Sequence, residues 1–124
     1  MRNALKALVM MLPLLLALHV NAHGITEPRH GGLVKVVGDV SLELVNAKDQ
    51  VSVYILDDSA WDTSGMSGKI KVESSAGTSE FPLTPNDDGG FTSPGATIPA
   101  GSTVLVIITK ADGYSKIAGR FVVE

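Results

Sequence analysis

From Leu33 onward, apolar and polar residues alternate with a period close to two. This period is typical of β-strands that bury one face. Turns are expected at Asp39 and at residues 46–49, because Asp and Asn favour turns by bonding to their own backbone. The pattern therefore predicts three strands in meander order, over residues 33–37, 40–44 and 51–55.

The second half of the chain continues the alternation in shorter runs. Residues 91–98 predict one or two very short edge strands, because Pro94 and Pro99 cannot donate to a ladder. The run 103–109 is apolar on both parities, which predicts a central strand or one that is covered on both faces. Further strands are expected over 69–73, 81–83 and 118–123, with turns at 57–68, 74–79 and 85–90.

About seven short strands, with turns every 8 to 12 residues, predict one all-β domain. The expected fold is an antiparallel β-sandwich of the immunoglobulin-like type. The chain has no cysteine, so its apolar core rather than disulfides must stabilise it, and thiolate metal sites are excluded.

The first residues have the three parts of a secretory signal. Arg2 and Lys6 give a positive start, Leu8–Leu18 is apolar, and small residues precede a cleavage site after Ala22. An apolar run of this length is shorter than the roughly 20 residues that span a bilayer, so an uncleaved anchor is the less favoured alternative. The predicted parts are a signal peptide over 1–22, an N-terminal arm over 23–32 and a β-sandwich domain over 33–124.

Removal of residues 1–22 would leave eight Lys and Arg residues against thirteen Asp and Glu residues, so the formal net charge would change from -3 to -5. A negative exported protein is a poor ligand for nucleic acids and for anionic membranes, and it is better matched to cations. The periplasm is the expected location, with full secretion as the alternative.

The predicted arm contains both histidines that would remain after cleavage, His23 and His30. Cleavage after Ala22 would make His23 the amino terminus, where its amine and imidazole could close a chelate ring on one metal ion. His30 would add a third nitrogen and Glu27 an oxygen. Neutral imidazole suits Cu(II), Zn(II) and Ni(II), with Cu(II) bound most strongly. The arm therefore predicts a copper site, or a zinc site in second place; alternatively, His23 lies in a frayed terminus and His30 is an exposed polar residue.

Two other groups of residues are candidate ligands. Asp57, Asp58 and Asp62, with Glu43 as a further candidate, offer oxygen ligands for calcium, but their spacing lacks the pattern of a known calcium loop. Solvated turn residues are the favoured interpretation. Met66 is a single thioether, which is more typical of core packing than of a Cu(I) site.

No motif in the chain predicts catalysis. A Gly-x-Ser-x-Gly elbow is absent, and neither histidine has a recognisable nucleophile or orienting partner in the sequence. An amino-terminal histidine with a second histidine is similar to the copper brace of oxidative polysaccharide enzymes. Here the second histidine follows after only seven residues and aromatic residues are few, so we expect the protein not to be an enzyme.

Several short segments resemble a group of small exported bacterial proteins and the periplasmic adaptor components of heavy-metal efflux systems. The resemblance lies in 30–32, 41–45, 53–57, 64–68 and 87–91. It implies a periplasmic β-sandwich that handles metal, copper above all, with a transition-metal ion and efflux components as partners. Members often have a His-rich stretch before the Gly-Gly pair, whereas this chain has only His23 and His30, which predicts a low metal capacity.

The competing hypothesis is a metal-free protein-interaction module. Such a domain would present a sheet edge or the loop 57–68 to another periplasmic protein, and it would need no histidine.

Overall fold

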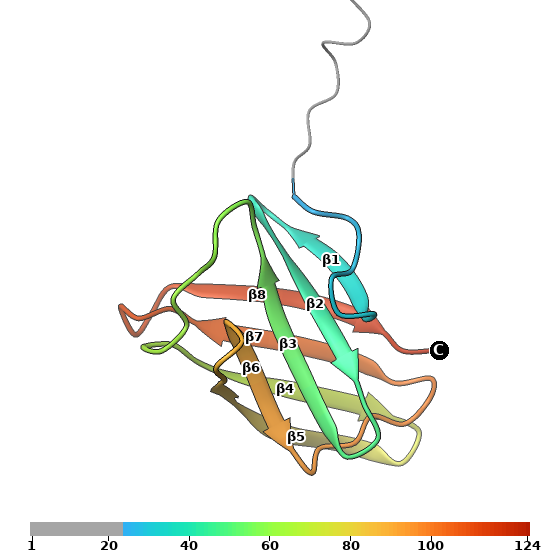
Figure 1. Ribbon diagram of the computed structural model, residues 1–124. Helices are drawn as coiled ribbons and strands as arrows, with labels where there is room; N and C mark the ends of the chain where they lie inside the picture. Colours follow the sequence, from blue (N-terminus) through green and yellow to red (C-terminus); the bar gives the residue numbers. More distant parts are fainter. Residues whose placement is uncertain (1–23) are drawn as a thin grey trace, which may run out of the picture.

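The computed structural model describes residues 24–124, which form eight β-strands and no helix (Figure 1). The all-β prediction is confirmed, with one strand more than the approximate count expected from the sequence. The strands are β1 (Leu33–Val37), β2 (Val40–Asn46), β3 (Gln50–Leu56), β4 (Ser67–Ser74), β5 (Gly77–Pro85), β6 (Gly90–Pro94), β7 (Thr103–Thr109) and β8 (Lys116–Val122).

All neighbouring strands are antiparallel, and they form one sheet in the order β1-β2-β3-β6-β5-β4-β7-β8. The sheet folds back on itself at β5, whose residues 77–83 pair with β4 whereas Thr84 and Pro85 pair with β6. As a result β1 and β8, the two ends of the sheet, lie against each other without a hydrogen-bonded ladder. The result is a nearly closed, barrel-like sheet.

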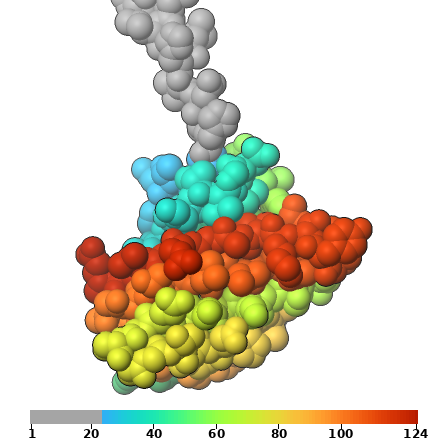
Figure 2. Space-filling model, turned by 180° about the vertical axis from the view of Figure 1, so that it is seen from behind, coloured from blue at the N-terminus to red at the C-terminus, as the bar shows by residue number. Residues whose placement is uncertain are grey.

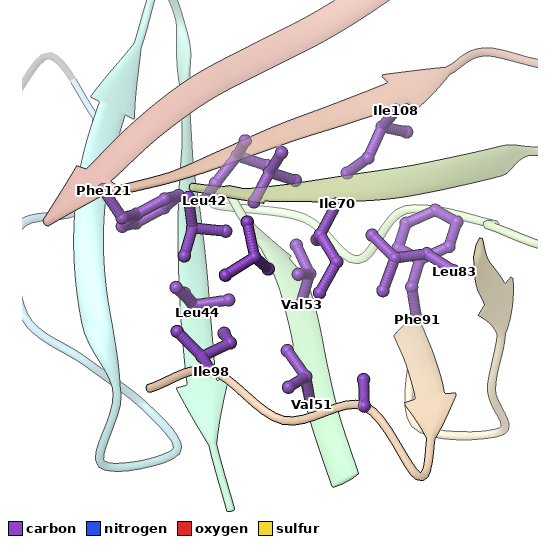
Figure 3. Packing of buried hydrophobic residues seen from close by; sticks show 14 of the residues in the cluster. Leu42, Leu44, Val51, Val53, Ile70, Leu83, Phe91, Ile98, Ile108 and Phe121 are labelled. Carbon is purple, nitrogen blue, oxygen red and sulfur yellow. The ribbon is translucent and has the colours of Figure 1, made fainter. Parts of the chain in front are cut away.

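The core lies between the two halves of this sheet, where the inward side chains of every second residue meet (Figure 3). The largest side chains with almost no exposed surface are Phe91, Leu42, Leu44, Leu56, Ile70, Leu83 and Ile108. A buried aliphatic or aromatic side chain contributes about 1.5–3 kcal/mol relative to an exposed one. This core is the source of stability that a cysteine-free chain requires.

Two details of the predicted strands are wrong. The turn expected over 74–79 is shorter, because β5 already begins at Gly77. The strand expected at an edge, β6, lies between β3 and β5. Strand β6 tolerates Pro94 because this proline is the last residue of the strand. At Pro94 the strand still pairs with Gln50 of β3, but its pairing with β5 has already ended. The prediction that 103–109 is a central strand is confirmed, since β7 lies between β4 and β8.

The predicted signal peptide and His23 lie outside the described residues. Within residues 24–124, no helix is long and apolar enough to cross a membrane.

Candidate metal centre in the N-terminal arm

The N-terminal arm, residues 24–32, lies on the outward face of β2 (blue in Figure 1). Ser41 and Glu43 alternate with core residues along β2 and would face solvent if the sheet were bare. Both are instead fully buried. The Ser41 hydroxyl donates to the carbonyl of Ile25 over 2.6 Å, and Glu43 binds the arm further along.

The Glu43 carboxylate accepts four hydrogen bonds, all from the arm. Backbone N–H groups of Arg29 (3.1 Å), His30 (2.8 Å) and Gly32 (2.9 Å) donate to its two oxygens. The fourth contact joins His30 Nδ1 to Glu43 Oε1 over 2.9 Å. The arm is therefore folded around a single buried carboxylate.

These hydrogen bonds decide the charge of Glu43. Burial raises the pKa of the carboxyl, because it disfavours the ionised form. The bond from the His30 ring and the three backbone N–H bonds act in the opposite direction and outweigh burial, so the pKa of Glu43 is lower than usual. Glu43 is consequently an anion at neutral pH.

His30 is held by Glu43 and by Tyr54. Its ring stacks on the Tyr54 ring with 3.6 Å between centroids and 6° between planes. The carboxylate favours the tautomer with the proton on Nδ1, and this leaves the lone pair on Nε2 for a ligand. The side chain is 36% exposed, so a ligand can reach it from solvent.

Two glycines permit these close approaches. A Cβ on Gly32 would collide with the Leu44 carbonyl group, whose carbon would be only 2.9 Å away. A Cβ on Gly90, in β6, would lie 2.5 Å from Tyr54 Cδ1 and 2.6 Å from the Val53 carbonyl oxygen. Gly90 thus leaves room for the ring on which His30 stacks.

We expect Gly90→Ala to displace the Tyr54 ring and lower the free energy of unfolding by about 1–3 kcal/mol, because a methyl group is forced into a filled space. The change is measured by urea denaturation, together with the NMR shifts of the His30 ring, which report stacking. Gly65→Ala is the matched control, since its Cβ would meet only Ala111 Cβ at 3.3 Å. Equal losses in both variants would contradict the expectation.

Of the other predicted ligands of the arm, Glu27 lies in the described part of the chain and His23 does not. Glu27 is exposed. No group of three or more His, Cys, Asp or Glu side chains among residues 24–124 is placed to hold a metal ion. A site at His30 would therefore need a ligand from His23 or from a second molecule.

The acidic loop forms turns, as the favoured interpretation predicted. Asp57 accepts from Trp61 Nε1 over 2.9 Å and from the backbone of Asp58. Asp62 accepts from the hydroxyl and the backbone N–H of Ser64. The pKa of Asp57 is lowered chiefly by the bond from Trp61, and that of Asp62 by the Ser64 hydroxyl.

Sequence reasoning missed the two residues that position His30. From the sequence, Glu43 is expected only as a neighbour of Asp57, Asp58 and Asp62, and Tyr54 is given no role in a site. The alternation along β2 gives no sign that a separate segment covers its polar face. The usable signal was the Gly31-Gly32 pair, which allows a chain to approach a strand closely.

Comparisons of the chain with protein-family models, with curated protein sequences and with solved structures found no match. Functional inference therefore starts from the geometry of His30, Glu43 and Tyr54.

Proposed function

We propose that the protein is a periplasmic accessory or carrier protein that binds copper through its N-terminal arm and serves heavy-metal resistance or efflux. The ligands are the amine and imidazole of His23, His30 Nε2 and an oxygen of Glu27. Zinc is the second metal that this ligand set suits. The protein acts by holding the ion and not as an enzyme.

The observation that supports this proposal most is the pair formed by Glu43 and His30. Histidines that bind metals usually donate their other ring N–H to a carboxylate, which fixes the tautomer and raises the basicity of the ligating nitrogen. Glu43 has this relation to His30, at 2.9 Å from Nδ1. A buried anion that accepts four bonds from one short segment also fixes the arm before any ligand binds.

The short distance along the chain between His23 and His30 also supports a shared site. The two residues are seven positions apart. Gly24, the residue next to His23, lies beside Ser41, and Ser41 is two residues along β2 from Glu43, which binds His30. One ion per molecule is expected, because the arm holds only these two histidines.

Native mass spectrometry of the exported protein, titrated with Cu(II) and Zn(II), tests the proposal. We expect one copper ion per molecule. A sample with one extra residue before His23 is the control for the terminal amine, and His30→Gln is the variant for the ring. Each change should weaken copper binding by about tenfold or more, the size found even for lost indirect partners of a metal. Copper binding that is unchanged in both samples would contradict the site.

A metal-free interaction module on an immunoglobulin-like sandwich is the second candidate. Such a module would present a sheet edge or the loop 57–68 to its partner, and it needs no histidine. The two candidates differ in pH dependence, because imidazole ligands must be deprotonated and metal affinity falls with pH. Binding of a protein partner through apolar contacts should respond little to the same change. Isothermal titration at several pH values separates the two.

A further inference from the structure

The outward face of β4, β7 and β8 is broad and is not covered by any other part of residues 24–124 (Figure 2). Strand register defines its centre. Leu105 in β7 lies between Lys71 of β4 and Arg120 of β8. Ile107 lies between Lys69 and Ala118. The half-buried Leu105 is therefore flanked by a cation on each side, and the half-buried Ile107 by one cation, Lys69.

The charge of this surface is opposite to that of the chain. We call it the basic face and define it by four cations, Lys69, Lys71, Lys116 and Arg120. The outward carboxylates on the same half of the sheet are Glu73 and Glu80, and Glu80 pairs with Lys69 over 3.3 Å. Residues 24–124 contain eight Lys and Arg residues and thirteen Asp and Glu residues, so the rest of this region has four cations and eleven carboxylates.

A small hollow lies within the basic face. It has a volume of about 140 Å³ and is lined by Ser67, Gly68, Lys69, Ile107, Thr109 and Lys116. Its lining combines one apolar side chain, Ile107, with two cations, Lys69 and Lys116, and its volume is enough for one side chain of a partner. Arg120 forms no ion pair within residues 24–124, and Lys116 is bound only to the Thr109 hydroxyl, over 3.0 Å.

We propose that the basic face is the docking surface for another protein, whose contact surface has acidic groups around an apolar centre. An apolar centre with a polar rim is the usual anatomy of a protein interface, and charge complementarity selects an acidic rim. This inference does not depend on metal binding by the arm.

Two other occupants fit the face less well. Membrane surfaces are bound by apolar side chains that insert below the headgroups. Here Leu105 and Ile107 are half-buried, and Val122 at the end of β8 is the one exposed large apolar side chain of β4, β7 and β8. No aromatic residue faces outward from these described strands. A symmetric dimer of the chain through this face would bring two basic faces together, and like charges across an interface are strongly unfavourable.

The test uses a capped twelve-residue peptide in which leucine alternates with glutamate as the acidic probe. The matched peptide has lysine in place of glutamate. Each is titrated into the isotope-labelled exported protein and followed by NMR. We expect the acidic peptide to shift amides of β4, β7 and β8, and the lysine peptide to leave them unchanged. The double variant Lys71→Glu with Arg120→Glu should weaken binding about tenfold, because two attractions become repulsions.

Lys35→Glu with Lys48→Glu is the control variant, since it makes the same change in net charge at two exposed residues, one in β1 and one in the turn between β2 and β3, that are not part of the basic face. Binding that weakens equally in both double variants would show a non-specific charge effect and overturn the proposal. So would equal binding of both peptides, or binding of neither at millimolar concentration. Vesicles with about 30% phosphatidylglycerol test a membrane as the occupant, and sedimentation tests a second copy of the chain. Attachment to the vesicles through the basic face would overturn the proposal. So would a dimer that Lys71→Glu with Arg120→Glu abolishes.

Discussion

Replacement of Phe91 by alanine is expected to lower the free energy of unfolding by about 3–5 kcal/mol, the usual range for a large aromatic residue in a core. Phe91 has no exposed surface and lies beside Leu83 where the sheet folds back between β5 and β6 (Figure 3). The substitution removes the transfer free energy of the ring and also leaves a cavity. Because β6 pairs with β5 over only two residues, little backbone pairing can compensate.

Urea denaturation followed by circular dichroism measures the effect, and Phe81→Ala is the matched control. Phe81 is only partly buried and packs against the margin of the same core. Phe81→Ala removes the same atoms as Phe91→Ala, so the difference in unfolding free energy between the two variants reports the burial of Phe91. We expect the Phe81 loss to be about half as large or less. Equal losses of unfolding free energy in the two variants would mean that Phe91 is not packed in the core where the sheet folds back between β5 and β6.

The alternation of apolar residues was sufficient to predict most of the strands. Val40, Leu42 and Leu44 repeat every second residue and all face the core. A two-residue period depends on strand geometry alone, so it survives without knowledge of neighbours. Strand order does not have this property. The position of β6 between β3 and β5 depends on pairing partners far apart in the sequence, and Pro94 pointed to an edge.

The candidate site was only partly predictable for a related reason. Its histidines stand out in composition, and the arm was predicted from them. The polar residues of β2, Ser41 and Glu43, were indistinguishable from a solvent-facing row until the arm was placed over them. Likewise the cations of the basic face come from three strands, and only the register of β7 with β4 and β8 places Lys71 and Arg120 on either side of Leu105.

Glu43→Gln is expected to lower the free energy of unfolding by about 2–4 kcal/mol at pH 7. Glutamine has nearly the same shape as glutamate, but one carboxylate oxygen becomes an NH₂ group, which cannot accept the N–H bonds of the arm. The hydrogen bonds that remain go to a neutral oxygen and not to a charged one. A hydrogen bond to a charged group contributes about 1.5–3 kcal/mol, and a buried donor without a partner costs about 1–3 kcal/mol. The total loss of free energy is limited because the arm can detach from β2, and its N–H groups then bind water. Hydrogen exchange should therefore accelerate at the amides of Arg29, His30 and Gly32 before global unfolding.

The difference in unfolding free energy between wild type and Glu43→Gln depends on pH, and the direction of this dependence follows from the pKa of Glu43. The pKa of Glu43 is lower in the folded than in the unfolded protein, so the unfolded state binds the proton more readily. The stability that the carboxylate provides is thus complete above the unfolded value of about 4.3 and is lost as pH falls through the folded value. We expect the difference in unfolding free energy between wild type and Glu43→Gln to shrink below about pH 4.

Urea denaturation of both proteins between pH 3 and pH 8 measures this difference, with Glu80→Gln as the control. Glu80 is 55% exposed and its ion pair with Lys69 is on the surface, so its loss should change stability by no more than about 1 kcal/mol. A difference for Glu43 that stays constant down to pH 3 would show that its charge does not hold the arm. His30 would then be oriented by Tyr54 alone, and the proposed copper site would lose the contact on which its tautomer depends.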